Sequence, residues 1–217
     1  MRASILRVTL NVARKELLDG IRLRAGYVTM GMFALTVIAF LSMSLAWGMD
    51  VRLASALLWI VIFFAATLQG ERLFAEEAAA GTLPFLWIYV PAQAVLFGKM
   101  AAHFVTLVVL AALIFPLVVI LMDAPLVLNG CFVGTLFLGL WGMAAADTLL
   151  AAVAANASVR GGLVPVLLLP SMLPILLPAI SLSAGGGEPT LLGGILIYDM
   201  ALTVGASMLF DSLWIES

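Results

Sequence analysis

Charged residues are scarce in this 217-residue chain, and that scarcity excludes most classes of protein. Lysine, arginine, aspartate and glutamate make up 10% of it, whereas apolar residues make up 65%. A soluble domain carries about 25% charged residues, so too few are present here to cover a water-exposed surface. The formal charge of −2 also leaves no basic face for nucleic acid. We therefore predict a membrane protein with no nucleic-acid partner.

Cysteine and nucleotide-binding motifs are equally sparse. Cys131 is the only cysteine, which excludes an internal disulfide and a thiolate metal cluster. A phosphate-binding loop requires Gly-x-x-x-x-Gly-Lys-Ser/Thr. The only Gly-Lys pair, Gly98-Lys99, is followed by Met100 and has Gln93 where the first glycine belongs. We expect no enzyme, no metal site and no firmly bound cofactor.

Long apolar runs predict an all-α polytopic membrane protein with six transmembrane helices. A spanning helix needs about 20 predominantly apolar residues. The runs cover 26–47, 54–69, 100–122, 126–155, 163–182 and 191–215. Stretches such as 107–114 are apolar at every position, whereas the strands of a membrane β-barrel alternate. The first run is longer than the roughly 7–15 apolar residues of a cleavable signal sequence, so we expect it to be retained.

The few positive charges are sorted along the chain. Six of the ten lysine and arginine residues precede the first apolar run. In a six-span topology, three more fall in loops on the same side of the membrane as the N-terminus, and only Arg52 falls on the other side. These nine are Arg2, Arg7, Arg14, Lys15, Arg22, Arg24, Arg72, Lys99 and Arg160. Positive residues concentrate on the cytoplasmic side of membrane proteins. Both termini are therefore expected in the cytoplasm, with the loops near residues 50, 123 and 185–188 outside.

Residues 1–25 form a segment distinct from the apolar body of the chain, 26–217. At 100° per residue, its apolar side chains lie within an arc of about 80° and its cations on an adjacent arc. The apolar set is Leu6, Leu10, Ala13, Leu17 and Ile21. This pattern predicts a helix in the headgroup plane, in contact with membrane lipid. Such a helix serves either as an anchor alone or as an elbow that transmits motion into the first span.

An acidic segment between the second and third spans is a candidate for contact with a soluble partner. Alanine, leucine and glutamate favour helix over residues 68–80, continuous with the second span. Gly81 suits a helix C-cap, and Pro84 stops any continuation. Pro91 then breaks the chain before Lys99 opens the third span. This cytoplasmic coupling segment would present carboxylates to a partner; the alternative is a solvated loop. Its candidate residues are Glu71, Arg72, Glu76, Glu77, Gly81, Thr82 and Leu83.

His103, Asp147 and Asp199 are ionisable residues within the predicted spans, where such groups are costly and often functional. His103 could ligate haem iron, or it could bond a neighbouring helix or a headgroup. Asp147 and Asp199 could share a proton, as in an aspartyl protease. The Gly-x-Gly-Asp half of that motif reads Ala-Ala-Ala-Asp at 144–147, and the two halves come in the wrong order. We therefore expect the aspartates to pair with polar neighbours.

Pro170, Pro174 and Pro178 share one face of the fifth span at i, i+4 spacing. Each lacks an N–H and frees the carbonyl four residues earlier. Such backbone is tolerated in a membrane only where it faces protein or a cavity, so we expect this face to be covered. The helix is either kinked by packing alone or forms a hinge that changes shape during an ATPase cycle.

The order of these motifs resembles a known family. Glu71-Arg72, Glu76-Glu77, 81–83 (Gly-Thr-Leu), Pro91 and Lys99 are similar to permease subunits of ABC-2 exporters. Residues 99–104 (Lys-Met-Ala-Ala-His-Phe) and 160–162 (Arg-Gly-Gly) before the proline-rich helix resemble the haem exporter protein B family of cytochrome c maturation. The resemblance implies a permease subunit without its own ATPase site, in the bacterial inner membrane, with residues 71–83 coupled to the ATPase.

The same resemblance implies the partners. They are a cytoplasmic ATP-binding subunit, a second permease copy, a haem-handling membrane subunit and a periplasmic haem chaperone. ATP hydrolysis by the separate subunit would drive haem export or release of the haem-loaded chaperone, with haem as substrate or transient ligand. Two alternatives stay open. One is an ABC-2 exporter of lipid or drug, and the other is a proton-coupled carrier that uses Asp147 and Asp199.

Overall fold

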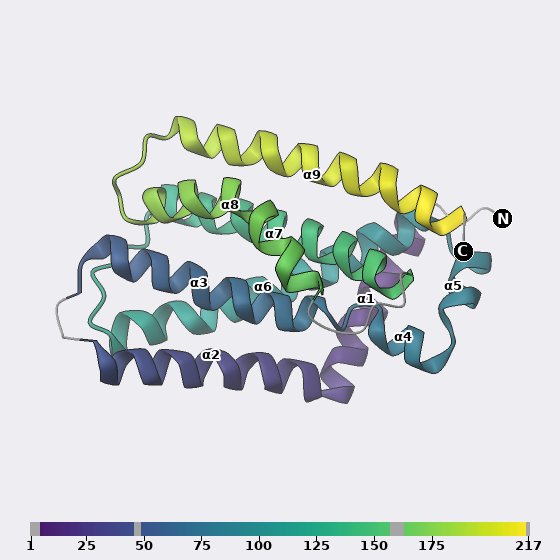
Figure 1. The fold of residues 1–217 in the computed structure, drawn as a ribbon, viewed down its shortest axis with the longest axis horizontal. Coiled ribbons are helices and arrows are strands. Elements are labelled where there is room, and N and C mark those ends of the chain that lie inside the picture. The colour runs from purple at the N-terminus through teal and green to yellow at the C-terminus, as the bar shows by residue number, and fades with distance from the viewer. Residues whose placement is uncertain (1–4, 46–48, 157–162, 216–217) are drawn as a thin grey trace.

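The computed structural model describes residues 5–45, 49–156 and 163–215, which form nine helices (Figure 1). The helices are α1 (Ile5–Leu23), α2 (Ala25–Ser44), α3 (Val51–Gly70), α4 (Ala75–Ala80), α5 (Leu83–Tyr89), α6 (Ala92–Leu121), α7 (Gly130–Asn156), α8 (Leu163–Ser183) and α9 (Thr190–Ile215).

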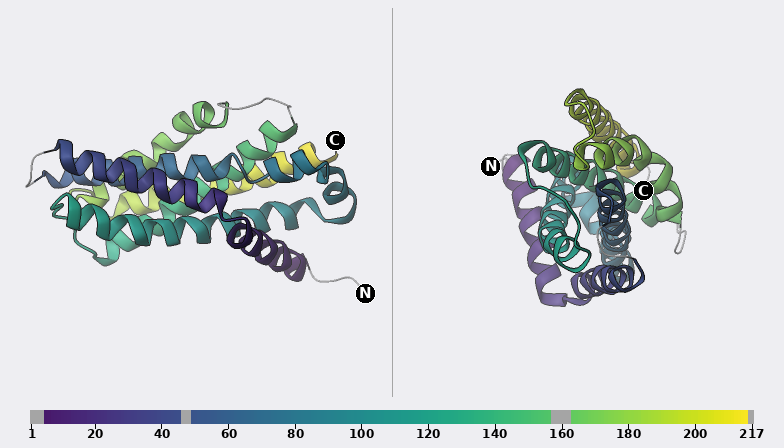
Figure 2. Two further views of the ribbon diagram at one scale, coloured as in Figure 1. Left: turned by 90° about the horizontal axis from the view of Figure 1, so that it is seen from below. Right: turned by 90° about the vertical axis from the view of Figure 1, so that its left-hand side faces the viewer.

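Six of these helices, α2, α3, α6, α7, α8 and α9, are long and apolar enough to cross a membrane. This confirms the prediction of six spans. They run along the long axis of the molecule, and α1 crosses obliquely at one end (Figure 2). Helix α6 begins at Ala92, because Pro91 is its N-cap and nothing after it interrupts the helix. Lys99 therefore lies within α6. The sequence had suggested that Lys99 opens this span, and it does not.

The two ends of the bundle carry different elements of the chain. Both termini lie at one end, together with α1, α4 and α5, which we call the α4–α5 end (Figure 1). The C-terminal ends of α2, α6 and α8 lie at the opposite end (Figure 1). An even number of spans brings the chain back to the side on which it started, so the predicted grouping of the loops near residues 50, 123 and 185–188 is confirmed.

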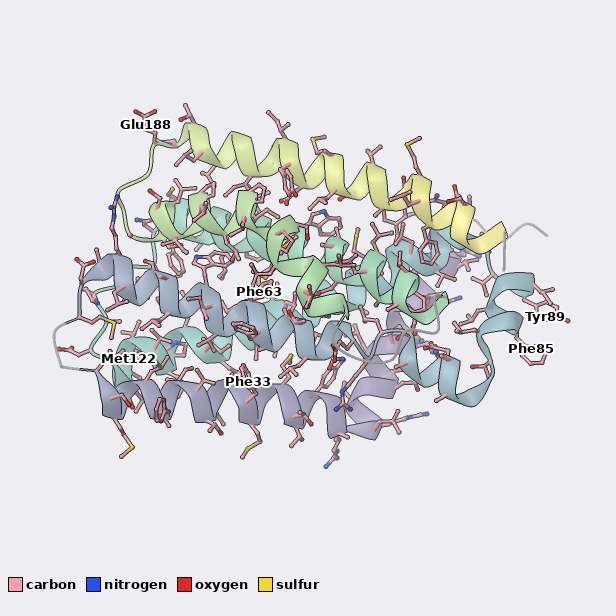
Figure 3. The ribbon with its side chains drawn as sticks, in the orientation of Figure 1. Phe33, Phe63, Phe85, Tyr89, Met122 and Glu188 are labelled. Carbon is pink, nitrogen blue, oxygen red and sulfur yellow. The ribbon has the colours of Figure 1, made fainter. Side chains whose placement is uncertain are left out.

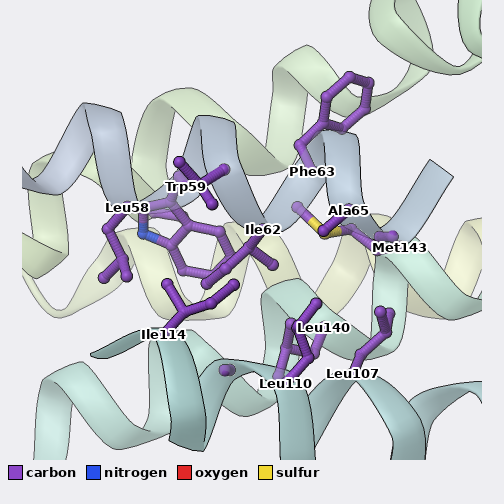
Figure 4. Close-up of a cluster of buried hydrophobic side chains, with 14 of the residues drawn as sticks. Leu58, Trp59, Ile62, Phe63, Ala65, Leu107, Leu110, Ile114, Leu140 and Met143 are labelled. Atoms are coloured by element: carbon purple, nitrogen blue, oxygen red, sulfur yellow. The ribbon is translucent and has the colours of Figure 1, made fainter. Parts of the chain in front are cut away.

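Apolar side chains of α3, α6 and α7 fill the interior of the bundle (Figure 4). Trp59 is the largest fully buried side chain, and its Nε1–H donates to Ser183 Oγ at 3.0 Å. Gly139 lies against the indole ring, where an added Cβ would come within 2.4 Å of it. Membrane helices associate through close van der Waals contact at small residues. Gly139 therefore allows α7 to approach α3 closely.

Helix α1 packs mainly against α6. None of its residues is fully buried, and Leu6, Leu10 and Ile21 of its apolar stripe are exposed. Gly98 of α6 lies where the two helices cross, and an added Cβ there would come within 2.7 Å of Val12. The missing side chain at Gly98 lets α1 lie directly on the α6 backbone.

The prediction of one continuous helix over residues 68–80 is wrong. Helix α3 ends at Gly70, and four turn residues separate it from α4. Within this turn Leu73 and Phe74 are buried, and the Phe74 ring lies 6.0 Å from that of Phe210 on α9. Tertiary packing of these two side chains outweighs the helix propensity of the segment.

The prediction for Gly81 is confirmed, and α4 does not continue to Pro84, which belongs to a separate helix. Gly81 is the C-cap of α4 and has a φ of 66°, which glycine adopts without strain. Pro84 does not end helical structure. It lies in the first turn of α5, where the missing N–H has no helical acceptor to lose.

Candidate functional site

A buried lysine lies at the centre of the α4–α5 end. Lys99 projects from α6, and its side chain is 1% exposed. Its Nζ lies 2.8 Å from Glu77 Oε1 on α4 and 2.9 Å from Glu16 Oε1 on α1. It also donates to the Leu73 carbonyl and sits 4.7 Å from the centroid of the Phe74 ring. One ammonium thus contacts three separate segments of the chain.

Lys15 of α1 completes this Lys99 cluster. Its Nζ lies 3.0 Å from Glu77 Oε1 and 3.1 Å from Glu16 Oε1. Partial burial alone would lower the pKa of Lys15, but the two carboxylates raise it above its ordinary value. Burial alone would raise the pKa of Glu77, yet Lys99 and Lys15 hold it below its usual range. Lys15 and Glu77 are therefore both charged at neutral pH.

The Lys99 cluster fixes α4 and α1 to a membrane span. A buried charge persists only with partners, and removal of one member of a buried pair is strongly destabilising. The turn after α3, helix α4 and helix α1 all bond the same ammonium. A displacement of α4 therefore acts on both α6 and α1.

Some of the predicted coupling residues are buried in the structure and others are exposed. Glu77 and Leu83 are buried, and Glu71 is half-buried. Arg72, Gly81 and Thr82 are exposed, and the side chain of Glu76 lies outside the described part. Because Glu77 is engaged within the chain, its role here is to hold α4 in place.

Sequence reasoning missed the most exposed part of this region, which is helix α5. Phe85, Ile88 and Tyr89 are 62%, 74% and 78% exposed. Phe85 and Tyr89 project from the α4–α5 end, far from Glu188 at the opposite end (Figure 3). The sequence could have indicated this surface, because the three apolar residues are one helical turn apart in a short segment outside the spans.

His103 and Asp147 were separate candidates in the sequence, and the fold brings them together. His103 Nε2 lies 2.9 Å from Asp147 Oδ2, and both side chains are fully buried. His103 Nδ1 and Asp147 Oδ1 have no hydrogen-bond partner. Gly70 of α3 makes room for the carboxylate, since an added Cβ would lie 2.8 Å from it. Of the two ring nitrogens, only Nδ1 is left for another ligand.

Asp199 stands apart from this pair. It is buried on α9, and neither of its carboxylate oxygens has a hydrogen-bond partner. Gly142 lies against it, and an added Cβ there would come within 2.2 Å of Oδ1. The expected polar partner is therefore found for Asp147 but not for Asp199. The two aspartates do not form the hydrogen-bonded dyad of an aspartyl protease.

The three interior prolines of α8 lie on its outward face. The helix continues through Pro170, Pro174 and Pro178. Pro170 and Pro174 are exposed in the single chain and Pro178 is half-buried, so the described residues of this chain do not themselves cover the face. The opposite face of α8 packs inward, through Met172 and Ile175 among others.

The fold defines a multi-pass membrane protein with six candidate spans, in which a helical segment outside the spans is tied to the bundle by buried charge. The chain belongs to the CcmB protein family, whose sequence profile matches residues 7–211. This is the haem exporter protein B family, so the chain is a permease subunit of the ABC system for haem export and cytochrome c maturation and is not an ATPase. A comparison with curated proteins found no match.

Proposed function

We propose that this permease subunit couples ATP hydrolysis by a separate cytoplasmic subunit to haem export or to release of a haem-loaded periplasmic chaperone. Family membership implies partnership with the ATPase of the cytochrome c maturation system. The observation that carries the proposal is the Lys99 cluster, which joins α4, outside the spans, to α6 and α1. In this proposal the chain responds to movement of the ATP-binding subunit, and ATP hydrolysis takes place in that subunit.

The α4–α5 end faces the cytoplasm in this proposal. The distribution of lysine and arginine supports that orientation, because nine of the ten fall on one side of a six-span topology. Both termini are then cytoplasmic, and the membrane is the bacterial inner membrane. Helix α1, within residues 1–25, lies in the headgroup plane, with Leu6, Leu10 and Ile21 in the acyl boundary. Residues 26–217 form the permease body.

Helix α5 is the surface that we assign to the ATP-binding subunit. Its exposed aromatic and aliphatic side chains project from the α4–α5 end, outside the six candidate spans (Figure 3). Apolar residues gathered on a water-facing surface mark contacts between proteins. Force applied at α5 passes to α4 across Gly81, and from Glu77 to Lys99.

The remaining partners are proposed from the family resemblance. They are a second permease copy, a haem-handling membrane subunit and the periplasmic chaperone, which would approach from the opposite end. Pro170, Pro174 and Pro178 form the proposed hinge, since three missing backbone donors weaken α8 along one face. Haem is the proposed substrate or transient ligand, and His103 Nδ1, which is buried, is the imidazole nitrogen without a hydrogen-bond partner.

The double substitution Phe85→Ser and Tyr89→Ser is expected to reduce co-purification with the ATP-binding subunit by at least about tenfold. Aromatic side chains at the centre of an interface commonly contribute 2 kcal/mol or more to binding, about thirtyfold in affinity. The measurement is the ratio of the two subunits after affinity purification of the complex in mild detergent.

Val127→Ser with Leu128→Ser is the matched control, since both residues are exposed and apolar but lie in the turn at the opposite end. This control should retain the ATP-binding subunit fully. Equal retention by both double variants would show that α5 is not the contact.

A further inference from the structure

Asp199 is a buried acidic residue near the middle of a membrane span. The candidate span within α9 covers Thr190–Ser212, and Asp199 is 2% exposed. Gly142 of α7 makes room for its carboxyl group, because an added Cβ there would collide with both Asp199 Oδ1 and Ile175 Cδ1 of α8. The carboxyl group therefore lies against α7, with the buried Ile175 beside it.

The side-chain donors around Asp199 are used elsewhere. The Tyr198 hydroxyl donates to the Ser171 carbonyl at 2.7 Å, and Thr203 Oγ1 donates to the backbone carbonyl of Asp199 at 2.7 Å. The indole N–H of Trp141 donates to Thr203 Oγ1 at 3.2 Å. None of these donors serves the carboxyl group, and both of its oxygens lack a hydrogen-bond partner.

No basic side chain of the described residues pairs with Asp199. Helix α9 packs mainly against α6, α7 and α8, and α8 carries no ionisable residue. Lys99 and His103 of α6 bond other acidic residues. The remaining ionisable residues of these helices are Cys131 and Asp147 on α7, and Tyr198 and Asp211 on α9. An ionised Asp199 would therefore have no counter-charge.

A buried carboxylate without a partner costs far more free energy than the neutral acid, so such a group takes up a proton. Ionisable residues kept at membrane depth commonly mark proton relays and ion pathways. Asp147 differs, because it bonds His103. We propose that Asp199 is a proton-binding site, protonated in this conformation, which releases its proton to water when α8 moves away from α7.

Helix α8 is the element whose movement would uncover the site. Ile175 lies beside the carboxyl group, and Pro174 immediately precedes it. Each interior proline removes a backbone hydrogen bond, so α8 bends more easily than its neighbours. On release the O–H bond of the carboxyl breaks, the proton passes to entering water, and the carboxylate stays on Asp199. The release step rests on the proposed function, because the ATP cycle would move α8; the protonated resting state does not.

Infrared difference spectroscopy tests the resting state. The carbonyl stretch of a protonated carboxyl is separate from the bands of carboxylates and shifts on exchange into deuterated water. The spectrum of the Asp199→Asn variant is subtracted from that of the purified full-length protein, both in lipid bilayers at neutral pH. We expect the wild type to show the band of one protonated carboxyl and the variant to lack it.

Asp211→Asn is the matched control, with the same substitution on the same helix. Asp211 Oδ2 accepts a hydrogen bond from Gln93 Nε2 at 2.8 Å, which favours its ionised form. Its substitution should remove no such band. Asp199→Leu supplies a second reference spectrum, since it also places a neutral side chain at the site.

The absence of the band in the wild type, or equal loss in Asp199→Asn and Asp211→Asn, would overturn the proton site. Failure of both neutral Asp199 variants to fold would contradict a neutral group at this position.

The release step is tested in the complex with the ATP-binding subunit, trapped with ATP and vanadate. Release predicts that the Asp199 band disappears in the trapped state. A band that persists in a complex that hydrolyses ATP would overturn the release step. If no ATP-binding subunit assembles with the chain, the proposed function fails, while the spectrum of the isolated chain still decides the proton site.

Discussion

Replacing Lys99 with methionine is expected to lower the free energy of unfolding by about 3 kcal/mol. Methionine fills a similar volume but leaves Glu16 and Glu77 with only the half-exposed Lys15 as counter-charge. The Leu73 carbonyl also loses the donor that holds the turn after α3 in place. Unfolding of the purified protein in mixed detergent and dodecyl sulfate micelles measures the change.

Lys15→Met provides the comparison for this prediction. It removes a lysine from the same cluster, but one whose side chain is 50% exposed, so solvent replaces much of the lost interaction. We expect a loss of about 1 kcal/mol or less. Equal losses for the two variants would contradict a central role for Lys99. In the assembled complex, Lys99→Met should also reduce ATP-dependent activity while the ATP-binding subunit stays bound through α5.

Gly98→Leu is expected to displace α1 from α6, because the two backbones cross at this residue. A Cβ at position 98 would lie 2.7 Å from Val12 and 3.0 Å from the Thr9 carbonyl oxygen, and a backbone atom cannot rotate away as a side chain can. Overpacking of this kind typically costs about 1–3 kcal/mol. Displacement of α1 also removes Glu16 from Lys99.

The measurement is disulfide crosslinking between cysteines introduced at Ala13 of α1 and Ala101 of α6, in a background without Cys131. Gly31→Leu is the control, since Gly31 lies on α2 with nothing within 4 Å of an added Cβ. Crosslinking should fall several-fold in Gly98→Leu and stay unchanged in Gly31→Leu. Undiminished crosslinking in both would show that α1 tolerates a side chain at the crossing.

The sequence predicted the spans well because each depends on a local property. A run of about 20 apolar residues is sufficient to specify a spanning helix, whatever its neighbours. The amphipathic pattern of residues 5–23 and the left-handed cap at Gly81 are local in the same sense. These features were predictable without knowledge of which helices meet.

The contacts of the site depend on tertiary neighbours and could not be predicted in the same way. Lys99 was read as the start of a span because its partners lie 22 and 83 positions away in the chain, at Glu77 and Glu16. His103 and Asp147 were identified as costly intramembrane groups, but their pairing required α6 and α7 to be placed side by side. Burial of Leu73 and Phe74 likewise overrode local helix propensity.

Coupling through α4 and α5 is the central claim, and photo-crosslinking from position 89 tests it most directly. With p-benzoylphenylalanine in place of Tyr89, illumination of the intact complex should attach this chain to the ATP-binding subunit. The same photo-reactive residue at Val127, exposed between α6 and α7, should give no such product. A crosslink to the ATP-binding subunit from position 127, or none from position 89, would contradict the proposed coupling end.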